Sequence, residues 1–364
     1  MMDLITFTVF LSVRGSPIEQ YGCFCKARMQ ILNLAKKGIC EPSKILLGAK
    51  IELKSLSVIL RHGLPDIMLQ FLGGFGDELL LTAVARELKR RSPNLRIWQV
   101  SHGAELLDHN PNYSRIFNWN HWPLRYSNLL NNRRCKIDGY ATAVIQGELY
   151  VPPTEHIIVI MSRKAGITGQ VSIKPDVFLS EAEKRKGTFA KGAIVVHYPG
   201  EKTYAHMRKN KLWDFHKFQR VVNMVAAGNI EGRKYPVIQL GSPGDPLLDG
   251  IIDLRGRTTL RESAAILYNC ETFLGQVGFL MHLARAVDCR AVIIYGGHEH
   301  SFQSGYVANE NLESNVECAP CWRLNTCDYG RKCMEMISVD DVLGAVQKVV
   351  SRNGMPLETE TVVI

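Results

Sequence analysis

The chain has 364 residues, of which 46% are hydrophobic and 22% charged, and it carries a formal net charge of +9. This composition is typical of a soluble globular protein with two domains, and it excludes a disordered chain and a small disulfide scaffold. Ten cysteines in this length favour a reducing compartment, so we expect a cytoplasmic protein. The positive charge favours an anionic partner such as a nucleotide diphosphate, a phosphorylated glycolipid or an anionic membrane surface. No basic stripe is interleaved with aromatic residues, which disfavours nucleic acid.

Residues 1–62 have no clear hydrophobic period, and we interpret them as an N-terminal accessory extension. The apolar run at 4–13 is too short to span a bilayer and predicts a strand. Residues 63–180 then predict a first α/β domain. Its expected elements are a strand at 67–72, a glycine-rich turn at 73–77, a helix ended by Pro93, a strand at 96–100 and a closing strand at 157–160.

The charged segment 180–191 predicts a hinge, and residues 181–352 predict a second α/β domain. Its expected strands lie at 193–197, 237–240, 272–274 and 290–295, and its expected helices at 213–227, 260–269, 279–286 and 339–350. Residues 353–364 predict a flexible tail. Strands that alternate with helices indicate parallel sheets. The sequence therefore predicts an α/β protein, with two Rossmann-like domains facing each other across a cleft and an N-terminal extension.

The most informative stretch is residues 275–284, where a glycine bend leads from an apolar strand directly into a helix. Gly278 lets the backbone approach a ligand, and the first helical turn presents N–H donors and a partial positive charge. A diphosphate suits this turn. In the alternative interpretation, Gly278 only permits tight packing and His282 is a core histidine.

Asp77 closes the glycine-rich turn at the start of a helix. A carboxylate at the mouth of an interdomain cleft can act as general base on an incoming hydroxyl, whereas the alternative is a helix cap without any substrate. A second candidate is the loop after the strand at 193–197. It holds basic residues, Lys202, His206, Arg208, Lys209 and Lys211, that either neutralise a diphosphate leaving group or form a solvated surface.

Four cysteines, Cys318, Cys321, Cys327 and Cys333, form the strongest metal-like pattern. Four soft ligands within sixteen residues can surround one tetrahedral zinc or iron ion, so we favour a structural metal. The alternative is four thiols packed in a C-terminal lobe.

Four segments follow one another in order: Gly-Asp-Glu-Leu-Leu-Leu-Thr-Ala at 76–83, Lys-Leu-Trp at 211–213, Gly-Phe-Leu-Met-His-Leu-Ala at 278–284, and Cys-Ala-Pro-Cys-Trp at 318–322 with Cys333-Met334 beyond it. Together they resemble glycosyltransferase family 9, the ADP-heptose heptosyltransferases of lipopolysaccharide assembly. The resemblance spans about residues 65–350. It implies a GT-B enzyme that transfers a sugar from a nucleotide diphosphate with inversion, without a metal or other cofactor in catalysis.

The resemblance also implies roles for individual residues. Asp77 matches the catalytic base, and Lys211 matches the lysine that binds the donor phosphates. The implied donor-binding residues are Gly74, Gly76, Gly200, Glu201, Gln276, Gly278, Met281 and His282, and those beside the nucleotide base are Leu254 and Gly256. This chain has Gln276-Val277-Gly278 where the family has aspartate, then serine or threonine, then glycine, which leaves the donor sugar open.

The implied partners are an ADP-heptose-like donor and an acceptor that is a glycolipid, a polysaccharide or a protein. Peripheral association with the inner membrane stays open. The cysteine cluster resembles that of autotransporter heptosyltransferases, which implies iron. Two rival functions remain: a catalytically silent nucleotide-sugar-binding module, and a nucleic-acid-binding protein built around the cysteines. Neither rival explains why Asp77 and Lys211 both fall in register with the family.

Overall fold

The computed structural model describes residues 42–71, 73–137, 144–145, 149–200, 209–323, 325–358 and 360–364. The chain divides into two units, Met1–Gly63 with Tyr126–Leu129, and Leu64–Arg125 with Leu130–Ile364. In the first unit, helix α2 (Pro42–His62) supplies Glu52, whose carboxylate accepts hydrogen bonds from the Ser127 hydroxyl at 2.6 Å and the Asn128 N–H at 2.7 Å. The strand expected at 4–13 lies outside the described residues.

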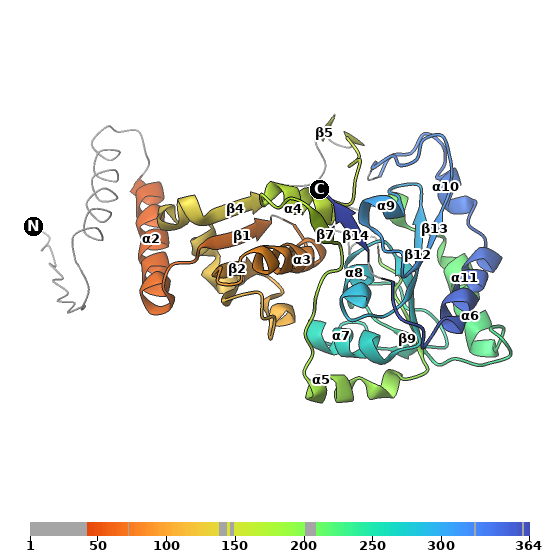
Figure 1. The fold of residues 1–364 in the computed structure, drawn as a ribbon. Helices are drawn as coiled ribbons and strands as arrows, with labels where there is room; N and C mark the ends of the chain where they lie inside the picture. Colours follow the sequence, from red (N-terminus) through yellow and green to blue (C-terminus); the bar gives the residue numbers. More distant parts are fainter. Residues whose placement is uncertain are drawn as a thin grey trace, which may run out of the picture. The chain divides into compact units, whose positions relative to one another are not determined.

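The second unit begins with a four-stranded parallel sheet in the order β3-β2-β1-β4 (Figure 1). The strands are β1 (Ile67–Phe71), β2 (Ile97–Ser101), β3 (Arg115–Asn118) and β4 (Arg134–Ile137). Helix α3 (Phe75–Arg91) follows β1 and buries its apolar face on this sheet. The predicted strands and helix are present, with boundaries that differ by a residue or two.

The strand expected at 157–160 is wrong, because these residues begin helix α4 (Ile157–Lys164). The ring of His156 caps this helix by accepting a hydrogen bond from the Ile158 N–H at 3.2 Å. A short continuous apolar run does not distinguish a buried strand from a buried helix. Here Ile157, Ile158 and Met161 are all buried in the core shared with α3, so tertiary packing decides for the helix.

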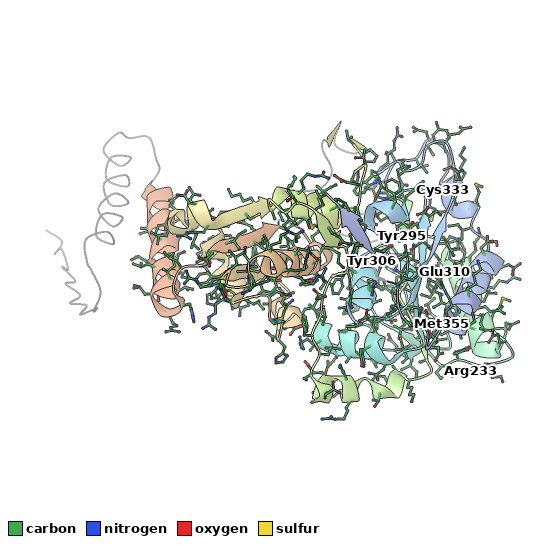
Figure 2. The ribbon with its side chains drawn as sticks, viewed as in Figure 1. Arg233, Tyr295, Tyr306, Glu310, Cys333 and Met355 are labelled. Carbon is green, nitrogen blue, oxygen red and sulfur yellow. The ribbon has the colours of Figure 1, made fainter. Side chains whose placement is uncertain are left out.

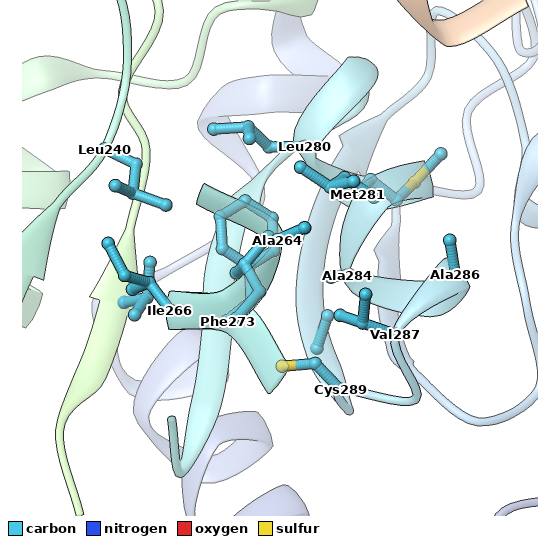
Figure 3. Close-up of a cluster of buried hydrophobic side chains, with 14 of the residues drawn as sticks. Leu240, Ala264, Ile266, Phe273, Leu280, Met281, Ala284, Ala286, Val287 and Cys289 are labelled. Carbon is cyan, nitrogen blue, oxygen red and sulfur yellow. The ribbon is translucent and has the colours of Figure 1, made fainter. Parts of the chain in front are cut away.

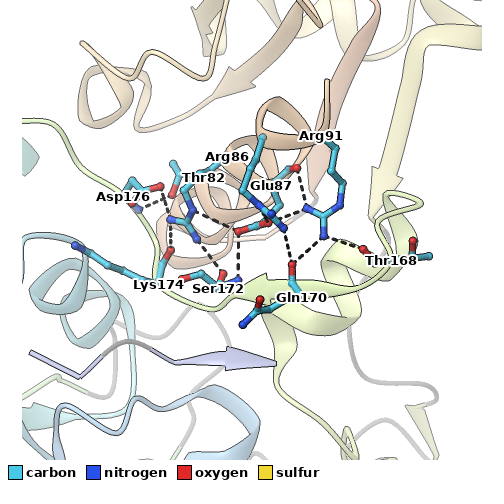
Figure 4. Close-up of polar contacts among 10 residues, drawn as sticks. Thr82, Arg86, Glu87, Arg91, Thr168, Gln170, Ser172, Lys174 and Asp176 are labelled. Atoms are coloured by element: carbon cyan, nitrogen blue, oxygen red, sulfur yellow. Dashed lines mark hydrogen bonds and ion pairs between the residues drawn. The ribbon is translucent and has the colours of Figure 1, made fainter. Parts of the chain in front are cut away.

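The connection between the two α/β halves contacts helix α3 on one side and the C-terminal strand on the other (Figure 4). Arg86 of α3 donates hydrogen bonds to Asp176 and to the backbone oxygens of Lys174 and Ser172. Strand β7 (Gln170–Ser172) pairs in antiparallel fashion with β14 (Thr361–Val363), so a strand lies where the sequence predicts a flexible tail. The C-terminal residues return to the connection between the halves.

The segment expected to be a hinge forms helix α5 (Glu181–Lys186) and the short helix η4 (Thr188–Ala190). Helix α5 packs against α7 (Leu260–Asn269). A Cβ atom at Gly187 would come within 2.2 Å of the Ala265 backbone oxygen, which shows how closely the two backbones meet. Arg261 of α7 forms an ion pair with Glu183. These contacts fix the segment on α7.

A six-stranded parallel sheet forms the core of the second half, in the order β10-β9-β8-β11-β12-β13. Its strands are β8 (Ile194–Val196), β9 (Val237–Gln239), β10 (Ile252–Asp253), β11 (Thr272–Gln276), β12 (Ala291–Gly296) and β13 (Glu310–Glu313). Along β8, Val195 faces one core while its neighbours Ile194 and Val196 face the other, as the alternation of a strand requires.

Helices cover both faces of this sheet. Helices α7 and α8 (Phe279–Ala286) fill the core shown in Figure 3, and α6 (Phe215–Ala227) and α11 (Val339–Ser351) fill the opposite core. The remaining short elements are η1 (Ala104–Leu107), η2 (Trp119–Arg125), η3 (Asn128–Arg133), β5 (Val144–Ile145), β6 (Leu149–Tyr150), η5 (Lys209–Lys211), α9 (Ser301–Ser304) and α10 (Lys332–Glu335). No helix among the described residues is long and apolar enough to span a membrane.

Candidate active site

The candidate residues of the second half follow the carboxyl ends of neighbouring parallel strands. Gly200 lies beyond β8, and Gln276 ends β11 immediately before the turn into α8. From β8 the chain builds outward through β9 and β10, then returns to build through β11, β12 and β13 on the other side. The gap between β8 and β11 is therefore a topological switch point, where open α/β sheets bind ligands.

The N-terminal turns of α3 and α8 meet. The rings of Phe75 and Phe279 lie 5.9 Å apart, and a Cβ atom at Gly76 would lie 3.5 Å from the His282 ring and 3.7 Å from the Phe279 Cα. These distances are ordinary contacts, so they show proximity without demanding glycine. Nothing lies within 4 Å of a Cβ atom at Gly74. The structure thus brings both glycine turns of the sequence prediction together.

Asp77 acts as a cap in this structure. One of its carboxylate oxygens accepts a hydrogen bond from the Gly74 N–H at 2.9 Å, which forms half of a capping box. A Cβ atom at Gly73 would lie 2.1 Å from the same carboxylate, so a larger residue there would displace the Asp77 side chain. Capping and base catalysis can coexist, because a carboxylate has several acceptor positions.

Lys211 is buried and forms an ion pair with Glu299, which lies beyond the end of β12. Burial opposes ionisation of Glu299, but the charge of Lys211, its hydrogen bond and the neighbouring His298 ring outweigh it and keep the pKa of this carboxyl below its ordinary value. Ser304 donates a further hydrogen bond to Glu299 at 2.9 Å. The lysine expected to bind phosphate therefore already has a carboxylate counter-ion.

Gln276 has one satisfied and one unsatisfied side-chain atom. Its amide oxygen accepts a hydrogen bond from the Trp213 N–H at 2.7 Å. Its amide nitrogen has no hydrogen-bond partner among the described residues, although the residue is only 2% exposed. The backbone of Gly278 is extended, with φ 165° and ψ −166°, a conformation that any residue can adopt. Glycine at 278 thus leaves space rather than relieving backbone strain.

Met281 and His282 lie on α8 and are buried (Figure 3 shows Met281). The Tyr295 hydroxyl contacts the Met281 sulfur at 3.2 Å, and the Tyr306 hydroxyl lies 2.7 Å from His282 Nδ1; both tyrosines are labelled in Figure 2. Burial, with His156 nearby, lowers the pKa of His282 to about 3, so the ring is neutral at physiological pH. In this structure Met281 packs in the core and His282 is a neutral, hydrogen-bonded ring.

The loops after β8, β9 and β10 are tied together by Asp245. Its buried carboxylate accepts hydrogen bonds from the Gly200 N–H at 2.8 Å and the Ser242 N–H at 2.7 Å. Gly256 has φ +65°, and a Cβ atom there would lie 2.3 Å from Pro243, so this turn requires glycine. Leu254 is half-buried and packs against the core beside it. Glu201 lies outside the described residues, as do Lys202, His206 and Arg208.

The four cysteines are free and half-buried. Burial raises the pKa of both Cys321 and Cys333, and the nearby thiols of the cluster raise them further. The donor chemistry therefore suits zinc or iron, since all four ligands are thiols in one lobe. In the part of the chain that the structure describes, however, no three His, Cys, Asp or Glu side chains are arranged to hold a metal ion.

With this geometry in place, comparison with known proteins shows which family the chain resembles. Residues 173–330 match the sequence profile of glycosyltransferase family 9 (heptosyltransferase). This segment is therefore similar to a glycosyltransferase family 9 domain. A search of the curated proteins by sequence finds no match. The matched residues cover most of the second half of the fold and exclude Asp77. The role of Asp77 therefore rests on the sequence resemblance alone.

Solved structures extend the comparison to both halves. The family 9 glycosyltransferase of Veillonella parvula has 14% identity and a TM-score of 0.56, over 79% of this chain and 98% of that chain. The ADP-heptose lipopolysaccharide heptosyltransferase II of E. coli has 12% identity and a TM-score of 0.56, over 79% and 99%. TibC of enterotoxigenic E. coli H10407, an iron-containing dodecameric glycosyltransferase, has 14% identity and a TM-score of 0.60, over 79% and 76%. These likenesses confirm the GT-B fold, and the family 9 match supports a glycosyltransferase.

Sequence reasoning missed three carboxylates that organise the family 9 domain and its neighbouring half. Glu299 pairs with Lys211, Asp245 holds the loop at Gly200, and Glu78 contacts His102 at 2.9 Å. Glu299 directly follows Gly296-Gly297-His298, and a glycine pair after an apolar strand was an available signal for it. Nothing in the spacing of Asp245 pointed to its partner.

Proposed function

We propose that this chain is an inverting transferase that moves a heptose or related sugar from a nucleotide diphosphate to a hydroxyl of a bacterial glycoconjugate. The observation that carries the proposal is the meeting of two helix N-termini, those of α3 and α8, beside the switch point between β8 and β11. A diphosphate at this point would accept hydrogen bonds from the unpaired N–H groups after Gly278. TibC was solved in complex with ADP-D-β-D-heptose, which supports an ADP-heptose-like donor.

In the proposed mechanism, the acceptor oxygen attacks the anomeric carbon while the bond from that carbon to the diphosphate oxygen breaks. Asp77 takes the proton of the attacking hydroxyl, and the diphosphate leaves with both electrons of the broken bond. The turn at Gly278 and the charge of Lys211 stabilise that leaving group, and the ion pair with Glu299 holds the Lys211 side chain in place. The unpartnered amide nitrogen of Gln276 is a donor for a sugar or phosphate oxygen.

The acceptor class is left open among glycolipid, polysaccharide and protein. The net charge of +9 suits an anionic membrane surface, and the cysteine content suits the cytoplasm, so we propose a cytoplasmic enzyme that works at the inner membrane.

The test combines ADP release with a matched pair of variants. Purified protein is incubated with ADP-heptose, with and without heptose-deficient lipopolysaccharide, and released ADP and product are measured. Asp77→Asn removes the base and keeps the shape, so we expect transfer to fall about a hundred- to ten-thousand-fold with ADP affinity unchanged. Asp341 occupies the same third helical position in the capping box of α11, which makes Asp341→Asn the control for lost capping.

Equal melting temperatures for the two variants, with transfer lost only in Asp77→Asn, support the base. Transfer at the parent rate in Asp77→Asn would leave Asp77 as a cap alone. A parent protein that binds ADP-heptose but releases no ADP with any acceptor would be a silent binding module.

We also propose that Cys318, Cys321, Cys327 and Cys333 bind one structural zinc or iron ion, which would draw the thiols together. All four donors are soft thiolates in one lobe, and the TibC structure is described as iron-containing. Metal analysis of protein grown with zinc and iron should give close to one ion per chain. Cys321→Ser should lower metal content and melting temperature, whereas Cys135→Ser, outside the lobe, should change neither. Four freely titrating native thiols without bound metal would refute the site.

A further inference from the structure

A histidine at the end of β2 lies in surroundings that the proposed function does not use. His102 directly follows β2, and its side chain is 42% exposed, whereas the carboxylate of its partner Glu78 is 3% exposed. Glu78 is the residue after Asp77 on α3. A buried carboxylate therefore contacts an accessible ring next to the proposed base.

Glu78 determines which ring nitrogen of His102 carries the proton. Its carboxylate accepts hydrogen bonds from the Ser101 hydroxyl at 2.5 Å and from the His102 backbone N–H at 2.9 Å, and it lies 2.9 Å from His102 Nδ1. A carboxylate accepts hydrogen bonds and does not donate them, so Nδ1 is the donor. In a neutral imidazole the other nitrogen, Nε2, then keeps its lone pair and is an acceptor. No described residue donates to it.

Trp119 fixes the plane of the His102 ring. The two rings stack with centroids 3.7 Å apart and planes inclined by 20°. Arg125 lies over the Trp119 ring at 5.0 Å and donates a hydrogen bond to the Phe71 backbone oxygen, at the end of β1. The ring is therefore held by a hydrogen bond at one edge and by stacking on one face, which is the preorganisation that a binding group needs.

His102 lies on the side of the sheet where we propose that the acceptor binds. Strands β1 and β2 are parallel neighbours, so their carboxyl ends share one edge of the sheet, and β1 leads into the turn that carries Asp77. A Cβ atom at Gly103, next to His102, would lie 3.2 Å from the Phe75 ring and 3.1 Å from Leu260 of α7. His102 thus adjoins both the first turn of α3 and the second half of the fold.

We propose that Nε2 of His102 accepts a hydrogen bond from an acceptor hydroxyl next to the attacking one, and so orients the attacking oxygen toward the anomeric carbon while its single proton stays available to Asp77. This inference rests on the proposed transfer reaction and names an acceptor-binding residue for it. The group recognised is a hydroxyl donor, as on a sugar or another polyol. The alternative is a structural role, in which His102 only supplies a hydrogen bond to Glu78.

The test uses two amide substitutions with different reach. Asparagine at 102 can replace Nδ1 as a donor to Glu78 but offers nothing at the position of Nε2, whereas glutamine reaches that position with its amide. We expect His102→Asn to lower kcat for ADP release from ADP-heptose in the presence of heptose-deficient lipopolysaccharide about a hundredfold, with the KM for ADP-heptose and the ADP affinity unchanged. His102→Gln should keep the rate within about tenfold of the parent, since its oxygen can still accept a hydrogen bond. His121→Asn is the control, because His121 also lies beside an aromatic ring, Phe117, in the same region.

A structural role predicts a different pattern, in which His102→Asn keeps the parent kcat because the contact with Glu78 survives. That result overturns the proposal, as does a parent protein whose ¹⁵N-histidine spectrum shows Nε2 protonated in place of Nδ1. The spectrum needs no variant and no acceptor. If the parent releases no ADP from ADP-heptose, the proposed transfer reaction fails, and this inference fails with it. If the parent releases ADP and His102→Asn releases it equally fast, only the role of His102 is overturned.

Discussion

Asp77 and Lys211 lie in opposite environments, and this difference decides how each can be tested. Asp77 is half-buried and caps its own helix, so replacing it disturbs a local contact. Lys211 is buried in an ion pair with a carboxylate 88 residues away in the sequence. Removing one partner of a buried pair leaves an uncompensated charge, which costs about 3–5 kcal/mol. A loss of activity in a Lys211 variant therefore needs a stability control.

We predict that Lys211→Met lowers both the unfolding free energy, by about 3–5 kcal/mol, and the affinity for ADP. The double variant Lys211→Met with Glu299→Gln should recover most of the stability, because neither partner is then charged. It should not recover ADP affinity, because the cation that stabilises the diphosphate is still missing. Urea unfolding and calorimetric titration with ADP and adenosine measure the two effects.

The adenosine titration separates two roles of Lys211. If Lys211 binds phosphate, its variant loses affinity for ADP and keeps its affinity for adenosine, since adenosine carries no phosphate. If the double variant binds ADP as tightly as the parent does, Lys211 serves packing and charge balance alone.

At the scale of elements, prediction succeeded where a strong local signal and the tertiary environment agree. Helices α7 and α8 have the predicted bounds, since α7 begins with a capping box from Thr259 and Glu262, and α8 begins after the glycine turn. The prediction for α4 failed because its local signal was ambiguous. An apolar run at Ile157 fits a strand or a helix equally, and only the packing against α3 decides for the helix.

Strand β14 yields a prediction because its pairing with β7 could not be derived from either segment alone. Arg285 and Arg290 donate hydrogen bonds to the backbone of the segment that leads to it, at 3.1 and 2.9 Å. We predict that deleting residues 356–364 lowers the unfolding free energy by about 2–4 kcal/mol, since several backbone hydrogen bonds are lost. Val362→Pro should reproduce part of that loss by removing one donor from the pair.

The control for this strand is Val363→Ala, whose side chain is 79% exposed and should change stability by less than about 0.5 kcal/mol. Denaturant unfolding compares the three variants with the parent. A deletion as stable as the parent would mean that β14 pairs too weakly with β7 to matter.

At the scale of the whole chain, the alternation of strands and helices was enough to predict two parallel sheets, because a parallel connection requires a crossover. The glycine turns were enough to predict which two helix N-termini meet. The sequence was not enough to predict the polar partners. Lys211 meets Glu299, and Gly200 meets Asp245, only after distant strands pair. Hydrogen bonds between residues far apart in the sequence produce no repeating pattern from which they could be predicted. The sequence thus predicted the strand-end edge of the site and left its internal charge balance undetermined.

Two buried histidines give the molecule a predictable acid response. His156 caps α4 and lies 3.1 Å from the Gly305 backbone oxygen, while His282 contacts Tyr306. Burial lowers the pKa of His156 from 6.5 to about 4 and that of His282 to about 3. The unfolded chain takes up these protons near pH 6.5 and the folded chain does not. Stability is therefore full above pH 6.5 and is lost progressively as the pH falls toward the folded pKa values.

We predict that the unfolding free energy falls between pH 6.5 and 4.5 by about 1.4 kcal/mol per pH unit for each of these histidines, and that His156→Gln makes the decline shallower. Carboxyl groups contribute mainly below this window, because their ordinary pKa values lie near 4. His216→Gln, which replaces an exposed histidine on α6, should leave the slope unchanged because burial is the cause of the effect. Urea unfolding at half-unit pH intervals measures the slopes. An identical slope for the parent and His156→Gln would mean that His156 takes up its proton in the folded state, in which case its burial at the cap of α4 does not exclude the charge.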